Sequence, residues 1–511
     1  MLEAGDYVNP TFNYEPRVNK PVLSYWIVAG LYKVFGISVA VQRFGIAIGA
    51  ILIIACAYVL ARAGSGKRAA GSGPLEAGSG KLEAGLWAAA GLAAAPRLVM
   101  FARRIFIDIW ITAFMALTLT FFALSERYPE RRRLFLILMY AAVGFGALTK
   151  GPVAIALPAM AFGLYLLVRG ELRRVTTMMI PLGIVIVGAI VVPWYFALYR
   201  EQGWTYISSF LIHENVERFT QGVGVQQPRP IWFYIPVVLS DSFPLSVLLF
   251  AAAAAWKERT KIETLLWCWI GSIVVFFSFS AGKQDLYIFP IVPAVAALAG
   301  IAIQRGLERP EWRKWVTGTV AVTGALLTIA GAAVVSLFNT AGRVYALDSA
   351  LIVGVLALTG GIAALALSVA RRTSAAAITL LAAIVALNWT FVIRVLPEFE
   401  RYKPVPSFSE TLQARLQPGD VVAHYNISLP SMVFYLRRPV DQYFHEDELL
   451  AAMQSGKRVY AVMTAGNYKA LQPRLGPTCV IDRRPTFEVK LREVLNRQPL
   501  PEILLITNRC P

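Results

Sequence analysis

Charged residues are scarce in this 511-residue sequence: Asp, Glu, Lys and Arg make up 16% of it, whereas hydrophobic residues make up 57%. Soluble domains contain about 25% charged residues, so the composition excludes a water-soluble globular enzyme and indicates an integral membrane protein. The net charge is +18, but the sequence lacks zinc-finger spacing, basic coiled-coil regions and RNA-binding aromatic motifs. We therefore predict no nucleic-acid partner and attribute the excess of Lys and Arg to cytoplasmic loops that face anionic lipids.

Cysteine is also rare, with four residues in the chain. Cys56 and Cys268 lie in apolar runs and are expected to be small core residues. Cys479 and Cys510 lie in the polar C-terminal segment, where a disulfide can form if that segment is extracytoplasmic. Two cysteines carry no framework pattern, so both the paired and the free state stay open.

Long apolar runs predict about twelve transmembrane helices in a mostly α-helical, polytopic membrane protein. Crossing a bilayer takes ~20 predominantly apolar residues. The predicted spans are 38–62, 84–102, 107–125, 133–149, 152–168, 175–197, 231–255, 262–280, 286–304, 315–337, 349–370 and 374–395.

The pattern changes after residue 396. The strand-like pieces VVAHY, VFYL, VYAVM and EILLIT alternate with helical stretches such as HEDELLAAMQSGK. This alternation predicts a small α/β domain at 399–511, which follows a transmembrane domain at 1–398.

Basic clusters set the expected orientation, because Lys and Arg concentrate in cytoplasmic loops. With the spans above, six clusters fall on one side, at 62–81, 127–133, 169–174, 257–261, 305–314 and 371–372. The α/β domain and the N-terminus are then extracytoplasmic. Polar residues follow Met1 at once, with no signal peptide or apolar anchor. Because an outer N-terminus without such a segment is hard to explain, we expect a first transmembrane helix to be missing from this sequence.

The Gly/Ala/Ser-rich stretch at 63–84 superficially suggests a phosphate-binding loop. Neither Lys67 nor Lys81 has the first Gly of the motif at the required distance before it, and neither is followed by Ser or Thr, so the Walker pattern fails. A flexible cytoplasmic linker is the better interpretation.

Ionisable residues beside the outer loops are the candidates for chemistry, because a charge at membrane depth is costly unless it is paired or hydrated. Asp108 begins an apolar span, where it is either a catalytic carboxylate or an N-cap. Lys150 lies in an LTKGP turn, which favours an ammonium held over a cavity. The alternative for Lys150 is a side chain that extends to the membrane interface.

Two further outer segments, HENVERF and GKQDLYIFP, contain suitable side chains. His213 is either a metal or substrate contact or an ordinary surface histidine. Arg218 suits a phosphate, because its planar guanidinium can pair with two oxygens, although a lipid headgroup contact is the alternative. Lys283 and Tyr287, four residues apart, could present an ammonium and a hydroxyl to one ligand, unless Tyr287 is an interfacial tyrosine.

Four cations on the outer side, Lys20, Lys150, Arg218 and Lys283, predict one cavity for an anionic ligand. Nucleotides are not available outside the cell membrane, so a lipid phosphate is the expected anion. The sequence lacks the inverted pattern of broken helices typical of secondary transporters.

These residues, in this order, resemble the lipid-linked-sugar glycosyltransferases of the GT-C class, especially the ArnT-like bacterial family, which is related to the protein O-mannosyltransferases. The matching segments cover most of residues 5–300. They are GDYVNPTFNYEPRVNKPVLSYW, FGALTKGPVAIALP, VPWY, HENVERF, QPRPIWFYIPVV and FFSFSAGKQDLYIFPIVPAVAAL.

The resemblance implies transfer of a sugar from a polyprenyl-phosphate donor to an acceptor at the outer face of the bacterial cytoplasmic membrane. Lys20, Lys150 and Arg218 resemble the cations that hold the donor phosphate, Tyr287 a tyrosine that contacts the donor, and Asp108 the second carboxylate of the cavity. In the family an acidic group of the first outer loop activates the acceptor, and in this chain Asp108 is our candidate for that catalytic role. The envelope acceptor stays open among lipid A, a protein and another glycan.

Two departures from the family pattern qualify this expectation. His213 matches a histidine that binds a metal in some members, but Asn19 replaces the partner glutamate, so no metal or other cofactor is expected. The acidic first outer loop of the family has no counterpart here, which predicts a weakly active or inactive chain. The alternatives are a transporter or flippase for lipid-linked sugars, and a scaffold that acts through the C-terminal domain.

Overall fold

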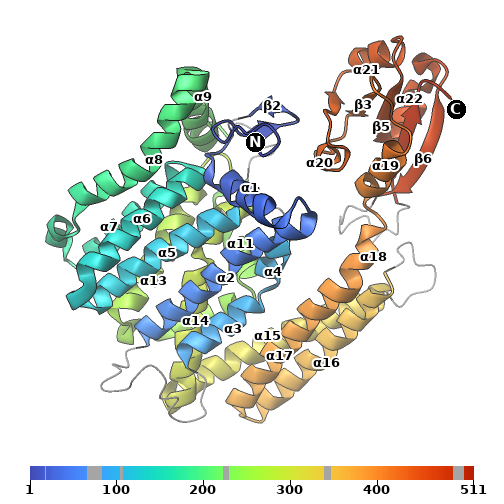
Figure 1. The fold of residues 1–511 in the computed structure, drawn as a ribbon. Coiled ribbons are helices and arrows are strands. Elements are labelled where there is room, and N and C mark those ends of the chain that lie inside the picture. Colours follow the sequence, from blue (N-terminus) through green and yellow to red (C-terminus); the bar gives the residue numbers. More distant parts are fainter. Residues whose placement is uncertain are drawn as a thin grey trace. The chain divides into compact units, whose positions relative to one another are not determined.

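The computed structural model describes residues 1–17, 19–65, 83–103, 108–222, 229–338, 347–486 and 500–510. Most of the predicted linker at 63–84 lies outside these residues. The described chain divides into two compact units (Figure 1). Unit 1 comprises Met1–Pro10, Arg17–Thr328 and Thr359–Asn388, and unit 2 comprises Thr11–Pro16, Ile329–Leu358 and Trp389–Pro511.

Unit 1 is helical. Its α-helices are α1 (Leu23–Phe35), α2 (Val39–Gly64), α3 (Ala84–Ala93), α4 (Pro96–Arg103), α5 (Asp108–Arg127), α6 (Arg132–Lys150), α7 (Val153–Val168), α8 (Ile180–Gln202), α9 (Trp204–Leu211), α10 (Arg218–Thr220), α11 (Tyr234–Asp241), α12 (Leu249–Ala254), α13 (Lys261–Ser278) and α14 (Val292–Glu308). Short 3₁₀ segments connect them, namely η1 (Pro129–Arg131), η2 (Leu172–Thr177), η4 (Ile231–Phe233), η5 (Leu245–Leu248), η6 (Trp256–Glu258) and η7 (Asp285–Ile291), and η3 (Ile212–Glu217) is a π-helical turn.

The long helices α15 (Pro310–Phe338), α16 (Ser349–Val369) and α17 (Thr373–Thr390) contribute residues to both units. Local sequence signals explain several helix starts. The Ser38 hydroxyl accepts a hydrogen bond from the Val41 amide at the start of α2, and Thr260 with Glu263 forms a capping box at the start of α13. These side chains satisfy amide groups that the first helical turn leaves without a partner.

The continuous segment of η7 and α14 is the core of unit 1, since 89% of its most apolar stretch is buried. Small residues let neighbouring helices approach it closely, as is usual for helices in membranes. At Gly300 a Cβ would lie 2.3 Å from the Ala84 carbonyl oxygen of α3. The backbones of α14 and α3 therefore touch at this point, and only glycine fits there.

Among the described residues, nine helices are long and apolar enough to cross a membrane, or eleven if each of two bent helix pairs is one span. The predicted polytopic helical fold is confirmed, and each of the twelve predicted segments falls on a helix or a bent pair. Two of them are not straight spans, because α3 and α4 meet at 56° and the segments Ile231–Asp241 and Leu245–Ala254 meet at 108°. A third, α7, is a shorter apolar helix.

Unit 2 contains a five-stranded mixed sheet in the order β4-β3-β5-β7-β6, formed by β3 (Val421–Tyr425), β4 (Asp441–Tyr443), β5 (Val459–Thr464), β6 (Cys479–Pro485) and β7 (Glu502–Thr507). The sheet is parallel between β4, β3 and β5 and antiparallel from β5 onward. The other elements are η8 (Phe391–Val395), α18 (Leu396–Glu400), α19 (Pro404–Gln413), α20 (Ser431–Leu436), α21 (Glu446–Met453), α22 (Ala465–Leu475), and the hairpin of β1 (Thr11–Phe12) and β2 (Glu15–Pro16).

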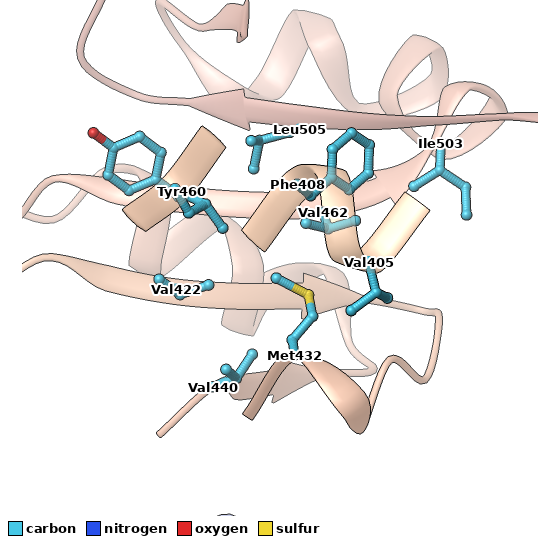
Figure 2. Close-up of a cluster of buried hydrophobic side chains, with 10 residues drawn as sticks. Val405, Phe408, Val422, Met432, Val440, Tyr460, Val462, Ile503 and Leu505 are labelled. Atoms are coloured by element: carbon cyan, nitrogen blue, oxygen red, sulfur yellow. The ribbon is translucent and has the colours of Figure 1, made fainter. Parts of the chain in front are cut away.

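Helices cover both faces of this sheet. Figure 2 shows one face, where Phe408 of α19 and Met432 of α20 pack on Tyr460 and Val462 of β5. On the other face, α21 and α22 pack on the alternate residues of β5, such as Ala461. Successive side chains of a strand point to opposite faces, so the apolar run VYAVM fits a strand that is buried on both sides.

One predicted strand is wrong: VFYL lies in helix α20. Pro430 precedes this helix and Arg437, at φ 49°, ends it, so the segment makes one short turn that buries Met432 against the sheet. The other three predicted strands are β3, β5 and β7. The state of the cysteine pair, which the sequence left open, is a disulfide between Cys479 and Cys510.

Candidate functional site

A cavity of about 410 Å³ within unit 1 brings together residues from widely separated parts of the chain. Five of the predicted site residues line it: Lys20, Asp108, Lys150, Arg218 and Tyr287. They come from the segment before α1, the start of α5, the end of α6, the start of α10 and η7. The rest of the wall is mostly apolar and includes Phe210, Phe219, Phe276, Phe277 and Leu157.

Asp108, the first residue of α5, and Lys150, the last residue of α6, form an ion pair. Both side chains are mostly buried. The ammonium of Lys150 also lies 5.5 Å from the centre of the Tyr287 ring, within the range of a cation–π contact. Asp108 therefore directs the Lys150 ammonium into the cavity and balances its charge.

Gly151 explains why α6 ends directly after Lys150. It has φ 80° and ψ −147°, a region that essentially only glycine occupies. A Cβ at this position would also lie 2.7 Å from the Phe210 ring. Pro152 then precedes α7, so the KGP turn fixes Lys150 at the cavity between two helices.

Arg218 follows the π-helical turn η3 and pairs with Glu214, with 2.8 Å between Nη1 and Oε2. Both residues line the cavity. In the same segment His213 pairs with Glu217, but its side chain is 60% exposed and does not line the cavity. The two pairs, each four residues apart, therefore point in different directions, and Arg218 is the one that reaches the cavity.

Lys20 reaches the cavity from the loop that precedes α1, and the structure gives its ammonium no ion pair among the residues it describes. Burial lowers the pKa of Lys20 to about 8, and the nearby positive charge of Lys150 acts in the same direction. A buried cation that gives up its proton this readily indicates a site that favours an added negative charge.

Tyr287 lies on η7, and its ring packs 5.0 Å from that of Phe277. Its hydroxyl is buried and makes no hydrogen bond to the described part of the chain. Asp285, two residues earlier, pairs with Arg97 of α4, and Arg97 also pairs with the buried Asp241 of α11 at 3.2 Å. This clamp ties the start of η7 to two helices and so fixes Tyr287.

The cavity does not include Lys283, although the sequence analysis grouped it with the other cations. Lys283 is buried, and its ammonium donates to the Ser280 carbonyl oxygen at 2.6 Å. Asn19, which directly precedes Lys20 in the sequence, does line the cavity. No group of three His, Cys, Asp or Glu side chains suited to a metal occurs among the described residues.

Sequence reasoning missed the partners that position the site. The Glu214–Arg218 pair was accessible from the four-residue spacing, but the Arg97 clamp joins positions nearly 190 residues apart and has no local signal. Three cations and the two carboxylates Asp108 and Glu214 leave the charged lining with one net positive charge. The cavity is therefore suited to an anion that carries an apolar chain.

The helical bundle and the C-terminal sheet have the fold of the ArnT-like GT-C class. Two crystal structures of ArnT from Cupriavidus metallidurans, one bound to undecaprenyl phosphate and one in the apo state, superpose with TM-scores of 0.78 and 0.76. Both are 22% identical in sequence, and they match 100% of this chain and 92% and 91% of their own.

Sequence comparisons agree with the fold. Residues 80–196 match the family of dolichyl-phosphate-mannose-protein mannosyltransferases. An undecaprenyl phosphate-alpha-4-amino-4-deoxy-L-arabinose arabinosyl transferase of Pseudomonas fluorescens is 28% identical over 348 residues, which cover 64% of this chain and 56% of that protein. The corresponding enzyme of Pseudomonas aeruginosa is 30% identical over 315 residues, with coverages of 60% and 54%.

The chain thus matches a little over half the length of these curated relatives. The resemblance to ArnT-like, lipid-linked-sugar glycosyltransferases is confirmed, and the protein is a multi-pass membrane protein.

Proposed function

We propose that this protein transfers a sugar from a polyprenyl-phosphate donor to an envelope acceptor at the outer face of the bacterial cytoplasmic membrane. The observation that carries the proposal is the convergence of Lys20, Lys150 and Arg218 in one cavity with Asp108 and Tyr287. The names of the relatives support an undecaprenyl-type carrier. The acceptor is a lipid A-like lipid, an envelope protein or another glycan.

The charge of the cavity fits the chemistry of such a donor. A polyprenyl-phosphate sugar is a phosphodiester with one negative charge, and the polyprenyl phosphate that leaves is a monoester, whose second pKa is about 6. Negative charge on the phosphate therefore grows during the reaction. Lys20, Lys150 and Arg218 stabilise that charge as it develops, which is commonly a leading contribution to catalysis.

Asp108 acts as the base in this scheme. Its carboxylate is held by Lys150 before the donor binds, and the donor phosphate then competes for the ammonium. The acceptor hydroxyl attacks the anomeric carbon from the face opposite the phosphate, and the anomeric carbon–oxygen bond to phosphate breaks with inversion. The acceptor proton goes to Asp108, and the electron pair of the broken bond goes to the phosphate.

Two further observations support the orientation. The described basic clusters at 127–133, 169–174 and 257–261 lie at those ends of α5, α6, α7 and α13 that do not line the cavity. The positive-inside rule assigns that side to the cytoplasm. The disulfide between Cys479 and Cys510 is of the kind found in oxidising compartments, as expected for an extracytoplasmic C-terminal domain.

The test measures binding and transfer separately in the purified full chain. The first readout is the Kd for polyprenyl phosphate against neutral polyprenol of the same length. The second is release of polyprenyl phosphate from a polyprenyl-phosphate sugar in the presence of extracted envelope lipids and proteins. Lys33, exposed on α1, provides a control, as Lys33→Met removes a lysine that does not line the cavity.

We expect tight binding of polyprenyl phosphate that Lys20→Met weakens and Lys33→Met does not. Binding together with acceptor-dependent release supports the transferase. If the protein binds polyprenyl phosphate but releases none from the donor with any of the extracted acceptors, a transporter or flippase is supported instead. Equal affinity for polyprenol and polyprenyl phosphate contradicts both.

A further inference from the structure

A second large hollow in unit 1, with a volume of about 560 Å³, lies between α6, α7 and α8. Helix α6 lies beside both α7 and α8 (Figure 1). Its lining is apolar apart from Tyr140, whose hydroxyl donates to the Met178 carbonyl oxygen at 2.8 Å. The groove therefore offers hydrocarbon contact but no free polar group along its walls.

The groove stays open because α8 is only partly covered by protein. Only 11% of the apolar stretch of α8 is buried. Gly183 lets α8 touch the Tyr140 ring of α6, whereas Gly163 of α7 and Gly188 of α8 have no atom within 4 Å of an added Cβ. The two helices also approach closely where Gly144 of α6 faces Ile190 of α8, and the unfilled channel lies beside these contacts.

Four arginines lie near the η2 end of this groove, and two of them are neutralised by one carboxylate. The side chain of Glu126 is buried and pairs with Arg132 at 3.0 Å and with Arg174 at 2.6 Å. Arg133 and Arg173 are exposed and have no ion pair within the described ranges. Arg173 is two residues before the lining residue Val175.

Arg133 is on the same side of α6 as the groove. It precedes Tyr140 by seven residues, so the two side chains lie on the same helix face. The groove is thus apolar along its length and has two positive charges at one end.

The length of the groove matches one leaflet of a bilayer. Its lining on α8 runs from Ile180 to Val192, a rise of ~18 Å at 1.5 Å per residue. Half of the hydrocarbon thickness is ~15 Å. A single acyl chain that enters at the η2 end would therefore reach about the bilayer midplane.

We propose that this groove binds one anionic phospholipid of the cytoplasmic leaflet. An acyl chain lies along α8 and the phosphate contacts Arg133 and Arg173. Basic residues beside grooves between transmembrane helices on the cytoplasmic side are suited to such headgroups. The site is distinct from the cavity of Lys150, since Arg133 and Lys150 lie at opposite ends of α6, ~26 Å apart along the helix.

The test counts the lipid retained by the purified full chain. The protein is equilibrated in nanodiscs of phosphatidylcholine with a minority of phosphatidylglycerol, transferred to mild detergent, and analysed by native mass spectrometry. We expect one phosphatidylglycerol to be retained in preference to phosphatidylcholine. Each arginine near a membrane surface contributes ~1 kcal/mol, or about fivefold, so the double variant R133Q/R173Q should lose about 25-fold in this preference.

Glycine variants test the tail separately from the headgroup. Gly188→Leu fills the groove and should abolish retention of the lipid. Gly271→Leu is the matched control, because Gly271 of α13 also has no atom within 4 Å of an added Cβ but does not line the groove. Arg200→Gln, at the other end of α8, is the matched charge control. Melting temperatures check that each variant is folded.

Three results would overturn the proposal. They are equal retention of phosphatidylcholine and phosphatidylglycerol, wild-type retention by R133Q/R173Q, and wild-type retention by Gly188→Leu in a folded protein. None of these readouts depends on sugar transfer, so this proposal can fail while the proposed function stands.

Discussion

Lys20 differs from the other cavity cations, since Lys150 pairs with Asp108 and Arg218 with Glu214. Burial beside Lys150 lowers its pKa to about 8. Its ammonium is therefore largely present at pH 7 and largely lost at pH 9. The phosphate contact made by this residue should have the same pH dependence.

We predict that affinity for polyprenyl phosphate falls as pH rises through about 8. The phosphate itself does not cause this fall, because its second pKa of about 6 leaves it doubly charged over the whole range. In Lys20→Arg the cation persists, since arginine is effectively always protonated, and the affinity should become flat between pH 7 and 9. Titration of Kd against pH checks this, and an unchanged slope in Lys20→Arg would assign the pH dependence to another group.

The Asp108–Lys150 pair separates binding from proton transfer. Asp108→Asn should leave the Kd for the donor within a fewfold of wild type, but lower kcat by about 10²–10⁴, the usual contribution of a positioned general base. Lys150→Met should weaken binding and lower kcat together. Steady-state kinetics with a polyprenyl-phosphate sugar measure this, and a fall in KM alone in Asp108→Asn would contradict the role of base.

At the scale of the element, the turn between α6 and α7 is the most constrained part of the site. Gly151 has a backbone conformation that other residues avoid, and the Phe210 ring lies against it. Gly151→Ala should destabilise the protein by about 1–3 kcal/mol and displace Lys150. Thermal unfolding in detergent measures this, with Gly271→Ala as a control that should be neutral or stabilising.

The η7 segment gives a second prediction at this scale. Arg97 does not line the cavity. It forms an ion pair with Asp285 and thereby fixes the η7 turn that contains Tyr287. Arg97→Gln should therefore raise the KM for the donor more than it lowers kcat, and Asp285→Asn should do the same. If both variants lower only the melting temperature and leave KM unchanged, the clamp is structural and does not position Tyr287.

Periodicity and motif spacing predict some elements and not others. Apolar runs predicted every span, because burial in lipid requires a local stretch of apolar residues. A short apolar run does not by itself distinguish a strand from a helix, and VFYL, predicted as a strand, packs on the sheet from helix α20. Five of the six residues proposed for catalysis and donor binding line one cavity. Lys283 does not line it, because its ammonium donates to the Ser280 carbonyl oxygen instead. The direction of a side chain cannot be predicted from motif spacing.

At the scale of the whole molecule, three cations separated by up to about two hundred residues must act on one phosphate. If they do, removing one changes the effect of removing another. Substitutions in separate sites, by contrast, usually add to within about 0.3–0.5 kcal/mol. The arrangement of unit 1 as a single bundle around α14 is what makes this coupling possible in physical terms.

The most direct test is a double-mutant cycle between Lys20 and Arg218, with the Kd for polyprenyl phosphate measured in wild type, Lys20→Met, Arg218→Met and the double variant. A shared phosphate predicts a coupling of about 0.5–3 kcal/mol, as seen for residues in one network. Free energies that add within error, or an affinity that neither substitution weakens, would mean that the two cations do not hold the same phosphate.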